Sequence, residues 1–465
     1  VTIAEDAPTG VHWIRFVNDQ GATSPVPFFV GMLPEVAEAS PNDRLAEAQA
    51  LPEVSAVLNG VLEKSGDVDC CSLQLTEGQT LVAVVQAHSV LQSPMDGILQ
   101  LLNESGTILA QNDDAREMDP MIVYPVTRTG TYYLRVFAFP AAPNSTIRYA
   151  GGSDYVYRLT TSVQPFVHHT LPLAVRSGET PALMPVGWNL SDLTSLAVAS
   201  PDAGNMAGLM WVGTDCLHEP IPVDVVDCEP QTYAENSSPL MIPACVTGQI
   251  GSGQEAVVAV DGTKGQKLRF QVIAQQRWSQ LDPVLSVRAA DGKVLKEVDD
   301  ISKENSDCDL TLSLPADGQY QVVVRDRFRH GGEQYFFLLR IEDAKPDFEP
   351  SAAKSEVVLK PDGPAEIAVT VNRREGLAES IAFSVDGLPE GLTCTPAISE
   401  KEGDSSKTVT LKIEGSRADG FSGPIRLIGT AAESGLTRPV VTRPAGRLQP
   451  LRELWLTAVP SPDKE

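Results

Sequence analysis

The chain lacks the short motifs by which most enzyme classes are recognised. Its 465 residues contain no Gly-x-Ser-x-Gly turn, no His-Glu-x-x-His pair and no glycine-rich loop that leads into a lysine-bearing helix. These absences remove the usual signatures of serine hydrolases, zinc peptidases and nucleotide-binding enzymes. The scattered acidic residues neither support nor exclude a two-carboxylate glycosidase site. We therefore expect no catalytic activity in this segment.

Cysteine and histidine do not occur at the spacing that a zinc site or a redox motif requires. The seven cysteines include no Cys-x-x-Cys, and the six histidines do not fall at ligand spacing. Two disulfides are candidates instead. Cys216 and Cys228 flank the short stretch "CLHEPIPVDVVDC", where a bridge would contribute about 3 kcal/mol. Cys245 and Cys308 fall within one candidate domain, and a bridge there would contribute about 4 kcal/mol.

Basic residues and long apolar runs are also scarce. The chain has 61 Asp and Glu against 36 Lys and Arg, a formal net charge of −25. Nucleic acid is therefore a poor partner, because phosphate binding needs clustered cations. No apolar run approaches the ~20 residues of a membrane-spanning helix. An acidic surface suits divalent cations or a basic partner.

Short strand-like runs are what the sequence does contain. Segments such as "TLVAVVQAH", "GTYYLRVFAF", "QKLRFQVIA" and "KTVTLKIEG" are rich in β-branched and aromatic residues and are separated by Gly, Pro, Asn and Asp. Sustained helical periodicity is missing, and the best helix candidate covers residues 43–51. The pattern predicts an all-β protein built of β-sandwiches or jelly rolls.

The chain contains an internal repeat of about 110 residues. The stretch "VLNGVLEKSGDVDCCSLQLTEGQTLVAVVQAH" recurs as "CVTGQIGSGQEAVVAVDGTKGQKLRFQVIAQQ", and the similarity continues through two further hairpins. In both copies an Asp precedes an apolar strand, a Gly turn follows, and the next strand ends in two acids. We assign Asp96 and Asp282 mainly to the shared fold, as turn residues, over a metal or catalytic role. The aligned pairs are Gly60 and Gly248, Asp96 and Asp282, Gly106 and Gly292, and Gly130 and Gly318.

The repeated pattern resembles the bacterial pre-peptidase C-terminal (PPC) domain, a β-sandwich or jelly-roll module of secreted proteins. "SGDVDCCSLQLTEGQTL", "SPMDGILQLLNESGTILAQNDD", "GTYYLRV" and "YVYRL" carry the resemblance. The stretch between the copies, "LPLAVRSGETPALMPVGWNL", is similar to Ig-like (IPT/TIG-like) spacers. The resemblance implies two PPC-like sandwiches that alternate with Ig-like sandwiches, in a protein that is secreted, periplasmic or at the cell surface. The expected domains are the end of an Ig-like domain at 1–31, PPC-like sandwiches at 32–163 and 233–343, an Ig-like spacer at 164–232, and an Ig-like sandwich with a tail at 344–465.

Two oxygen-rich patches flank the entry to the first repeat. In collagen-binding relatives of the PPC domain, an acidic linker and an Asp-rich turn together hold calcium, and this sequence resembles that arrangement. Ca²⁺ prefers six to eight oxygen ligands, which carboxylates and an amide help to provide. Ser40 stands where the usual motif has a second glutamate. The alternative is that Asn42 and Asp43 cap a short helical turn while Asp67 and Asp69 form a solvated turn. The candidate ligands are Glu38, Asn42, Asp43, Asp67 and Asp69.

Aromatic and basic residues near predicted loops offer a second kind of site. Trp188, Trp211 and Trp278 are either ligand contacts or core residues of the sandwiches. A basic strip suits an anionic polymer or an acidic neighbour, although a shared solvated face explains it more simply. The histidine pair at 168–169 is a solvated or packed pair in preference to a ligand set. The strip comprises Arg325, Arg327, Arg329 and His330.

Together these features predict a non-catalytic binding or spacer protein that attaches to protein or polysaccharide at a cell surface and is stabilised by calcium. One alternative is the accessory region of a secreted hydrolase or peptidase whose catalytic domain lies outside this chain. The other is a structural subunit whose copies assemble with one another.

Overall fold

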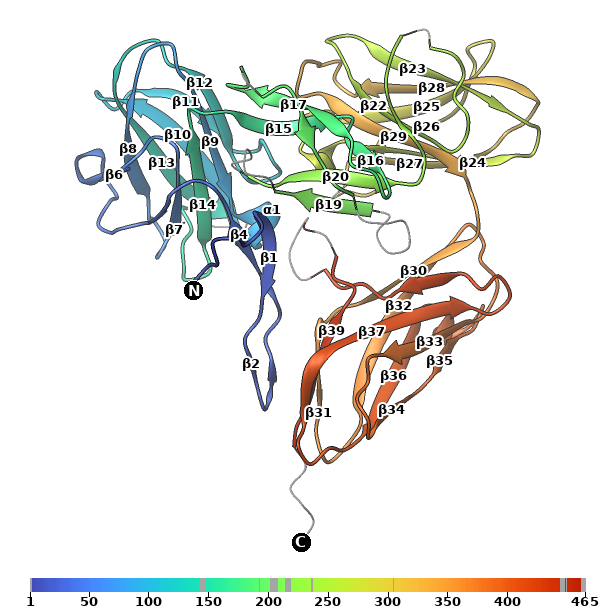
Figure 1. Ribbon diagram of the computed structural model, residues 1–465. Coiled ribbons are helices and arrows are strands. Elements are labelled where there is room, and N and C mark those ends of the chain that lie inside the picture. Colours follow the sequence, from blue (N-terminus) through green and yellow to red (C-terminus); the bar gives the residue numbers. More distant parts are fainter. Residues whose placement is uncertain are drawn as a thin grey trace. The chain divides into compact units, whose positions relative to one another are not determined.

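Strands make up nearly all of the regular structure (Figure 1). The computed structural model describes residues 2–142, 148–191, 193–200, 208–213, 219–235, 237–303, 305–443, 448 and 450–460. Within these ranges the helices are α1 (His88–Leu91), η1 (Leu45–Glu47), η2 (Gln275–Arg277) and η3 (Asp404–Ser406). The predicted all-β fold is confirmed. The prediction of a helix over 43–51 is wrong, because only η1 forms there and the chain then pairs as the strand β6 (Gln49–Ala50). Strand pairing gives hydrogen-bond partners to backbone groups that would have none at the ends of a short helix.

The first sandwich packs the sheet β11-β10-β13-β8-β6 against the sheet β12-β9-β14-β7-β5. Its core consists of buried aliphatic residues such as Leu73, Leu81, Leu99 and Leu134, which alternate along their strands. The strands are β5 (Glu35–Ala37), β6 (Gln49–Ala50), β7 (Ala56–Val61), β8 (Asp69–Leu75), β9 (Thr80–Gln86), β10 (Met95–Asn103), β11 (Ile108–Asn112), β12 (Met121–Pro125), β13 (Gly130–Pro140) and β14 (Val156–Ser162).

A spacer of two small sheets, β15-β17-β18 and β16-β20-β19, follows the first sandwich. Val175, Leu183, Val223 and Val225 form its core. Figure 1 shows these strands in green between the two larger sandwiches. They are β15 (Phe166–Leu171), β16 (Ala174–Arg176), β17 (Ala182–Trp188), β18 (Leu196–Ala197), β19 (Gly208–Val212) and β20 (Ile221–Val226).

The second sandwich packs the sheet β21-β22-β29-β24-β27 against the sheet β23-β28-β25-β26. It repeats details of the first sandwich. In each, a glycine lies beneath an aromatic ring, so that a Cβ on Gly60 would stand 2.3 Å from Tyr157 and one on Gly248 would stand 2.6 Å from Phe337. The strands are β21 (Pro230–Thr232), β22 (Ala244–Gln249), β23 (Glu255–Gly262), β24 (Lys267–Ile273), β25 (Pro283–Ala289), β26 (Val294–Val298), β27 (Cys308–Ser313), β28 (Gly318–Asp326) and β29 (Phe336–Asp343).

The chain divides into two compact units. One comprises residues 1–11 and 29–343, and the other comprises residues 12–28 and 344–465. In the second unit the sheet β30-β32-β36-β34 packs against a larger sheet ordered β31-β39-β37-β33-β35, with β38 beside β37. Its strands are β30 (Asp347–Ala352), β31 (Glu356–Leu359), β32 (Ala365–Arg374), β33 (Ile381–Asp386), β34 (Leu392–Thr395), β35 (Ala397–Ser399), β36 (Thr408–Gly415), β37 (Phe421–Ala431), β38 (Thr437–Pro439) and β39 (Leu454–Ala458).

The first thirty residues form two short strand pairs. β1 (Gly10–Ile14) pairs with β4 (Val26–Val30), and β2 (Val17–Asn18) pairs with β3 (Gly21–Ala22). The inner pair packs on β31 and β39 of the second unit. No helix within the described ranges is long and apolar enough to cross a membrane.

Candidate metal centre in the first sandwich

The turn that leads into β8 brings two aspartates into the protein. Gly66 takes a positive φ of 91°, and the Asp67 N–H donates to the Lys64 carbonyl at 3.0 Å, which closes the turn. The Asp67 carboxylate accepts the Glu63 N–H at 2.5 Å. Asp69, the first residue of β8, is also buried, and its carboxylate accepts the Tyr157 hydroxyl at 2.7 Å. Both acids are therefore held with little access to water.

The segment before η1 lies against these aspartates. The Cys70 N–H donates to the Asn42 carbonyl at 3.0 Å, which ties the segment to β8. The Asn42 side chain is 1% exposed and interacts with the carboxylates of Glu38 and Asp69, but its amide oxygen has no hydrogen-bond partner among the described residues. An unpaired buried polar group costs about 1–3 kcal/mol. Such an amide oxygen is available to a cation.

Charge repulsion adds to the cost of this cluster. Burial, with smaller contributions from the charges of Glu38 and Asp67, raises the pKa of Asp69 to about 7 against the hydrogen bonds from Tyr157 and Asn42. Burial likewise raises the pKa of Glu38, helped by the charges of Glu63 and Asp67. Carboxylates that are buried together without a counter-charge favour a proton or a cation.

Four of the five predicted ligands therefore come together, namely Glu38, Asn42, Asp67 and Asp69. The fifth, Asp43, is exposed, and its charge acts on the buried thiol of Cys70. In the described part of the chain, no three His, Cys, Asp or Glu side chains stand ready to hold a metal ion by themselves. A bound cation would have to draw Glu38 from its hydrogen bond with Ser40 and use the Asn42 amide oxygen and water.

The alternative explanation of Asn42 as a helix cap is wrong. The residue that precedes η1 is Arg44, and no side chain caps the turn. Asn42 is instead buried against β8. The remaining explanation without a metal is that the acids are fixed by local hydrogen bonds from Glu63, Ser40 and Tyr157.

Tyr157 is the residue in contact with this cluster that the sequence interpretation missed. It lies on β14, pairs in register with Gly60, and is fully buried beneath that glycine's strand. Comparison of the two repeats could have identified Tyr157, because "YVYRL" in the first copy is matched by "YFFLL" in the second. The second copy thus has Phe337 where the first has a hydroxyl that meets Asp69.

The three tryptophans lie where parts of the first unit meet. Trp278 is buried, Trp211 packs edge-on against it at 5.0 Å between ring centroids, and Arg116 lies 4.2 Å above its ring. Trp188, on the spacer, packs with Phe166 against Val82 and Val84 of the first sandwich. These contacts join the spacer to both sandwiches and account for the tryptophans without a ligand.

Two buried ion pairs reinforce the same junction. Arg116 of the first sandwich donates to Glu219 at 2.7 Å, and both side chains are nearly inaccessible to solvent. Arg277 of the second sandwich donates to both oxygens of Asp224 at 2.7 and 2.9 Å. Glu219 and Asp224 lie just before and within β20, so one spacer strand holds a cation from each sandwich.

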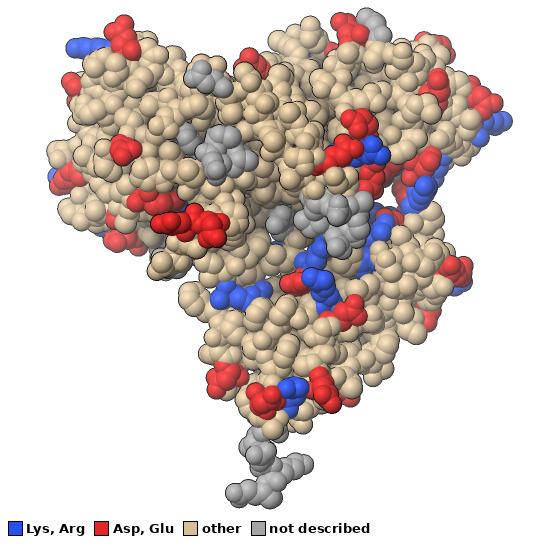
Figure 2. Space-filling model, in the orientation of Figure 1, with Lys and Arg blue, Asp and Glu red and all other residues tan. Residues whose placement is uncertain are grey.

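The predicted basic strip is paired with acids. Arg325 contacts Glu297 at 3.6 Å, Arg327 contacts Asp299 at 3.3 Å and Asp300 at 3.6 Å, and Arg329 contacts Glu255 at 3.1 Å. Several basic side chains on the face drawn in Figure 2 likewise lie beside acidic ones. His330 lies 4.0 Å from Asp326. This pairing leaves little net positive charge for an anionic polymer.

The predicted disulfide between Cys245 and Cys308 is wrong. Both cysteines are free thiols, and they face opposite sides of the same sheet, Cys308 in the sandwich core and Cys245 toward the spacer. The Cys308 thiol donates to the Pro283 carbonyl at 3.1 Å. Of the other predicted pair, Cys216 lies outside the described residues and Cys228 is a free thiol. His168 and His169 are buried and packed on Phe336.

Similarity to known proteins is partial. No family model matches the chain. A probable subtilase-type serine protease of Deinococcus radiodurans is 35% identical over 97 residues, which cover 21% of this chain and 13% of that protein. Among solved structures, the M60 catalytic domain with two CBM51 domains from Clostridium perfringens aligns with 61% of this chain and 36% of its own, at 12% identity and a TM-score of 0.17. Tripeptidyl peptidase 2 aligns with 99% of this chain and 34% of its own, at 8% identity and the same TM-score. At these TM-scores the structural alignments support no argument.

Proposed function

We propose that this chain is a non-catalytic accessory region of a secreted peptidase, which holds β-sandwiches at a fixed spacing and attaches the protein to a surface protein or polysaccharide. The observation that carries the proposal is the junction at β20. Breaking a buried ion pair costs about 3–5 kcal/mol, so two such pairs on one strand resist separation of the sandwiches. The partial identity with a subtilase-type protease supports the peptidase context.

Calcium is the proposed cofactor of the first sandwich. Glu38, Asn42, Asp67 and Asp69 are the residues that would hold it, and Tyr157 orients Asp69. Bound Ca²⁺ would neutralise buried carboxylates and give the Asn42 amide a partner. It would also join the segment at Glu38 to the turn at Asp67, and so stiffen the approach to the sandwich.

Two assays of the 465-residue chain test this function. A fluorophosphonate probe should label no serine, and stoichiometric labelling would contradict the non-catalytic assignment. Co-sedimentation with insoluble collagen and with cellulose should retain the chain on one of these matrices, and retention should fall in EDTA. If neither matrix retains it and sedimentation velocity shows concentration-dependent oligomers, the chain is a subunit of an assembly and the attachment proposal is wrong.

A further inference from the structure

Two thiols meet at the seam between the spacer and the second sandwich. Cys245, on β22, is 1% exposed and pairs in register with Pro230 of β21 on one side and Arg340 of β29 on the other. Cys228 lies two residues before Pro230 and is half-buried. Cys228 packs against the buried cluster that contains Cys245.

The two side chains share one apolar cluster. Leu173, Ala174 and Val226 come from the spacer, and Phe336 and Leu338 come from β29 of the second sandwich. Within this cluster the Cys245 thiol donates a hydrogen bond to the Cys228 sulfur. The two thiols therefore lie in one cluster and interact directly, which is the arrangement from which a disulfide forms.

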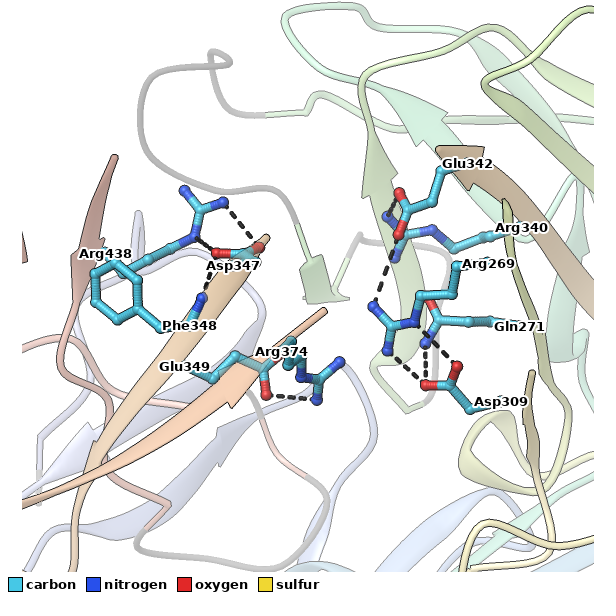
Figure 3. A network of polar contacts seen from close by, with 10 residues as sticks. All are labelled: Arg269, Gln271, Asp309, Arg340, Glu342, Asp347, Phe348, Glu349, Arg374 and Arg438. Atoms are coloured by element: carbon cyan, nitrogen blue, oxygen red, sulfur yellow. Dashed lines mark hydrogen bonds and ion pairs between the residues drawn. The ribbon is translucent and has the colours of Figure 1, made fainter. Parts of the chain in front are cut away.

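The surroundings favour a thiolate on the more accessible of the two sulfurs. The hydrogen bond from Cys245 lowers the pKa of Cys228, and the charge of Arg340 lowers it further against the effect of burial. Figure 3 shows Arg340 near Arg269, and the Arg269 guanidinium forms an ion pair with the Asp309 carboxylate. Among the described residues, Arg340 itself makes only a long ionic contact of 4.0 Å to Glu342. The positive charge of Arg340 therefore acts on the neighbouring Cys228 and Cys245 thiols and favours their thiolate forms.

We propose that Cys228 and Cys245 form a dithiol that closes to a disulfide by exchange with a small-molecule disulfide, and so locks the spacer covalently to the second sandwich. The Cys228 thiolate attacks the disulfide of oxidised glutathione and releases one glutathione thiolate, which leaves a mixed disulfide. The Cys245 sulfur, after losing its proton to solvent, attacks the Cys228 sulfur and releases the second glutathione. Two protein thiols are oxidised as one glutathione disulfide is reduced.

Mass spectrometry of the intact chain tests this pairing. The fully reduced 465-residue protein is incubated with oxidised glutathione at pH 8, quenched with N-ethylmaleimide and digested with Asp-N and Glu-C together. Cleavage before Asp227 and after Glu235 separates Cys228 from Cys245, and cleavage before Asp224 separates both from Cys216. We expect a cross-linked pair of the 227–235 and 236–255 peptides, with the other thiols alkylated.

Variants make the result unambiguous. Cys245→Ala should abolish the cross-link, whereas Cys394→Ala, which removes a half-buried thiol in the other unit, should leave it intact. Cys228→Ser replaces a half-buried residue and repeats the loss if Cys245→Ala does not fold. Cross-linking of Cys216 to Cys228, or alkylation of both Cys228 and Cys245 after prolonged exposure to the disulfide, would overturn the proposal.

Discussion

The two repeats share a frame but differ at one place, and the difference locates the candidate site. The same buried aspartate supports the same bend in each: Asp119 accepts the N–H groups of Ala87 and His88, and Asp307 accepts those of Ala274 and Gln275. A tyrosine at the same position of each repeat donates its hydroxyl to the carbonyl four residues earlier. Residues that hold the frame are therefore present twice.

The residues around the acidic cluster, in contrast, occur only in the first repeat. The register of β8 with β13 and of β23 with β28 aligns Asp69 with Ala256, and therefore Asp67 with Gln254. Tyr157, which donates to Asp69, is matched by Phe337. Three connected groups are absent together from the second sandwich, which folds without them. The cluster is thus not required by the fold, and a cation site is the proposal that gives it a use.

The largest expected effect comes from the junction, where each sandwich contributes one arginine. Arg277→Met leaves Asp224 buried without its partner and should lower the free energy of unfolding of the first unit by about 3–5 kcal/mol in urea denaturation. Arg176→Met removes an exposed pair with Glu179 in the same unit and should change it by less than about 1 kcal/mol. Equal effects of the two variants would mean that the junction is not fixed by its ion pairs.

The shared frame can be broken at equivalent glycines. Gly60→Ala and Gly248→Ala each place a methyl group closer to an aromatic ring than van der Waals contact allows. Each should therefore lower the free energy of unfolding by about 1–3 kcal/mol in the same experiment. Gly31→Ala, in the same unit and with nothing within 4 Å of the added Cβ, is the matched control. A clear cost at Gly60 and none at Gly248 would show that the two copies do not share this packing.

Low pH should destabilise the spacer through its two buried histidines, His168 and His169 on β15. Burial lowers the pKa of His169 to about 3 and that of His168 well below 6.5, the latter helped by the charges of Arg116 and His169. The unfolded chain takes up these protons below about pH 6.5 and the folded chain does not, so stability falls as the pH drops. The loss should be about 2 kcal/mol per histidine between pH 7 and pH 5. Urea denaturation of His169→Gln should show a shallower decline, and an unchanged slope would contradict the assignment.

The smallest effect should come from the hydroxyl that distinguishes the copies. Tyr157→Phe makes the first sandwich resemble the second and should cost about 1–2 kcal/mol, because Asp69 loses its hydrogen bond. In the Asp69→Ala background the same change should cost much less. Thermal unfolding of the four proteins gives this coupling. Additive effects would mean that the hydrogen bond does not contribute.

The sequence predicted the β fold, and four of the five candidate ligands that it singled out lie together, since both follow from local patterns. Alternating apolar residues identify strands wherever they pair, and the Asp67 turn lies next in sequence to β8. The residues it could not identify depend on pairing between distant segments. Tyr157 reaches Asp69 from 88 residues away, and Arg116 reaches Glu219 from 103 residues away. The disulfide prediction failed for a related reason, because spacing along the chain does not show that Cys245 and Cys308 face opposite sides of one sheet.

The central claim is that the first sandwich holds a calcium ion and the second does not. Isothermal titration of Ca²⁺ into the chelator-treated 465-residue chain measures this directly. The account predicts one ion per chain, lost in an Asp67→Asn, Asp69→Asn double variant and retained in a control that changes Gln254 of the second copy to Ala. Two ions per chain, or no binding at millimolar calcium, would contradict it.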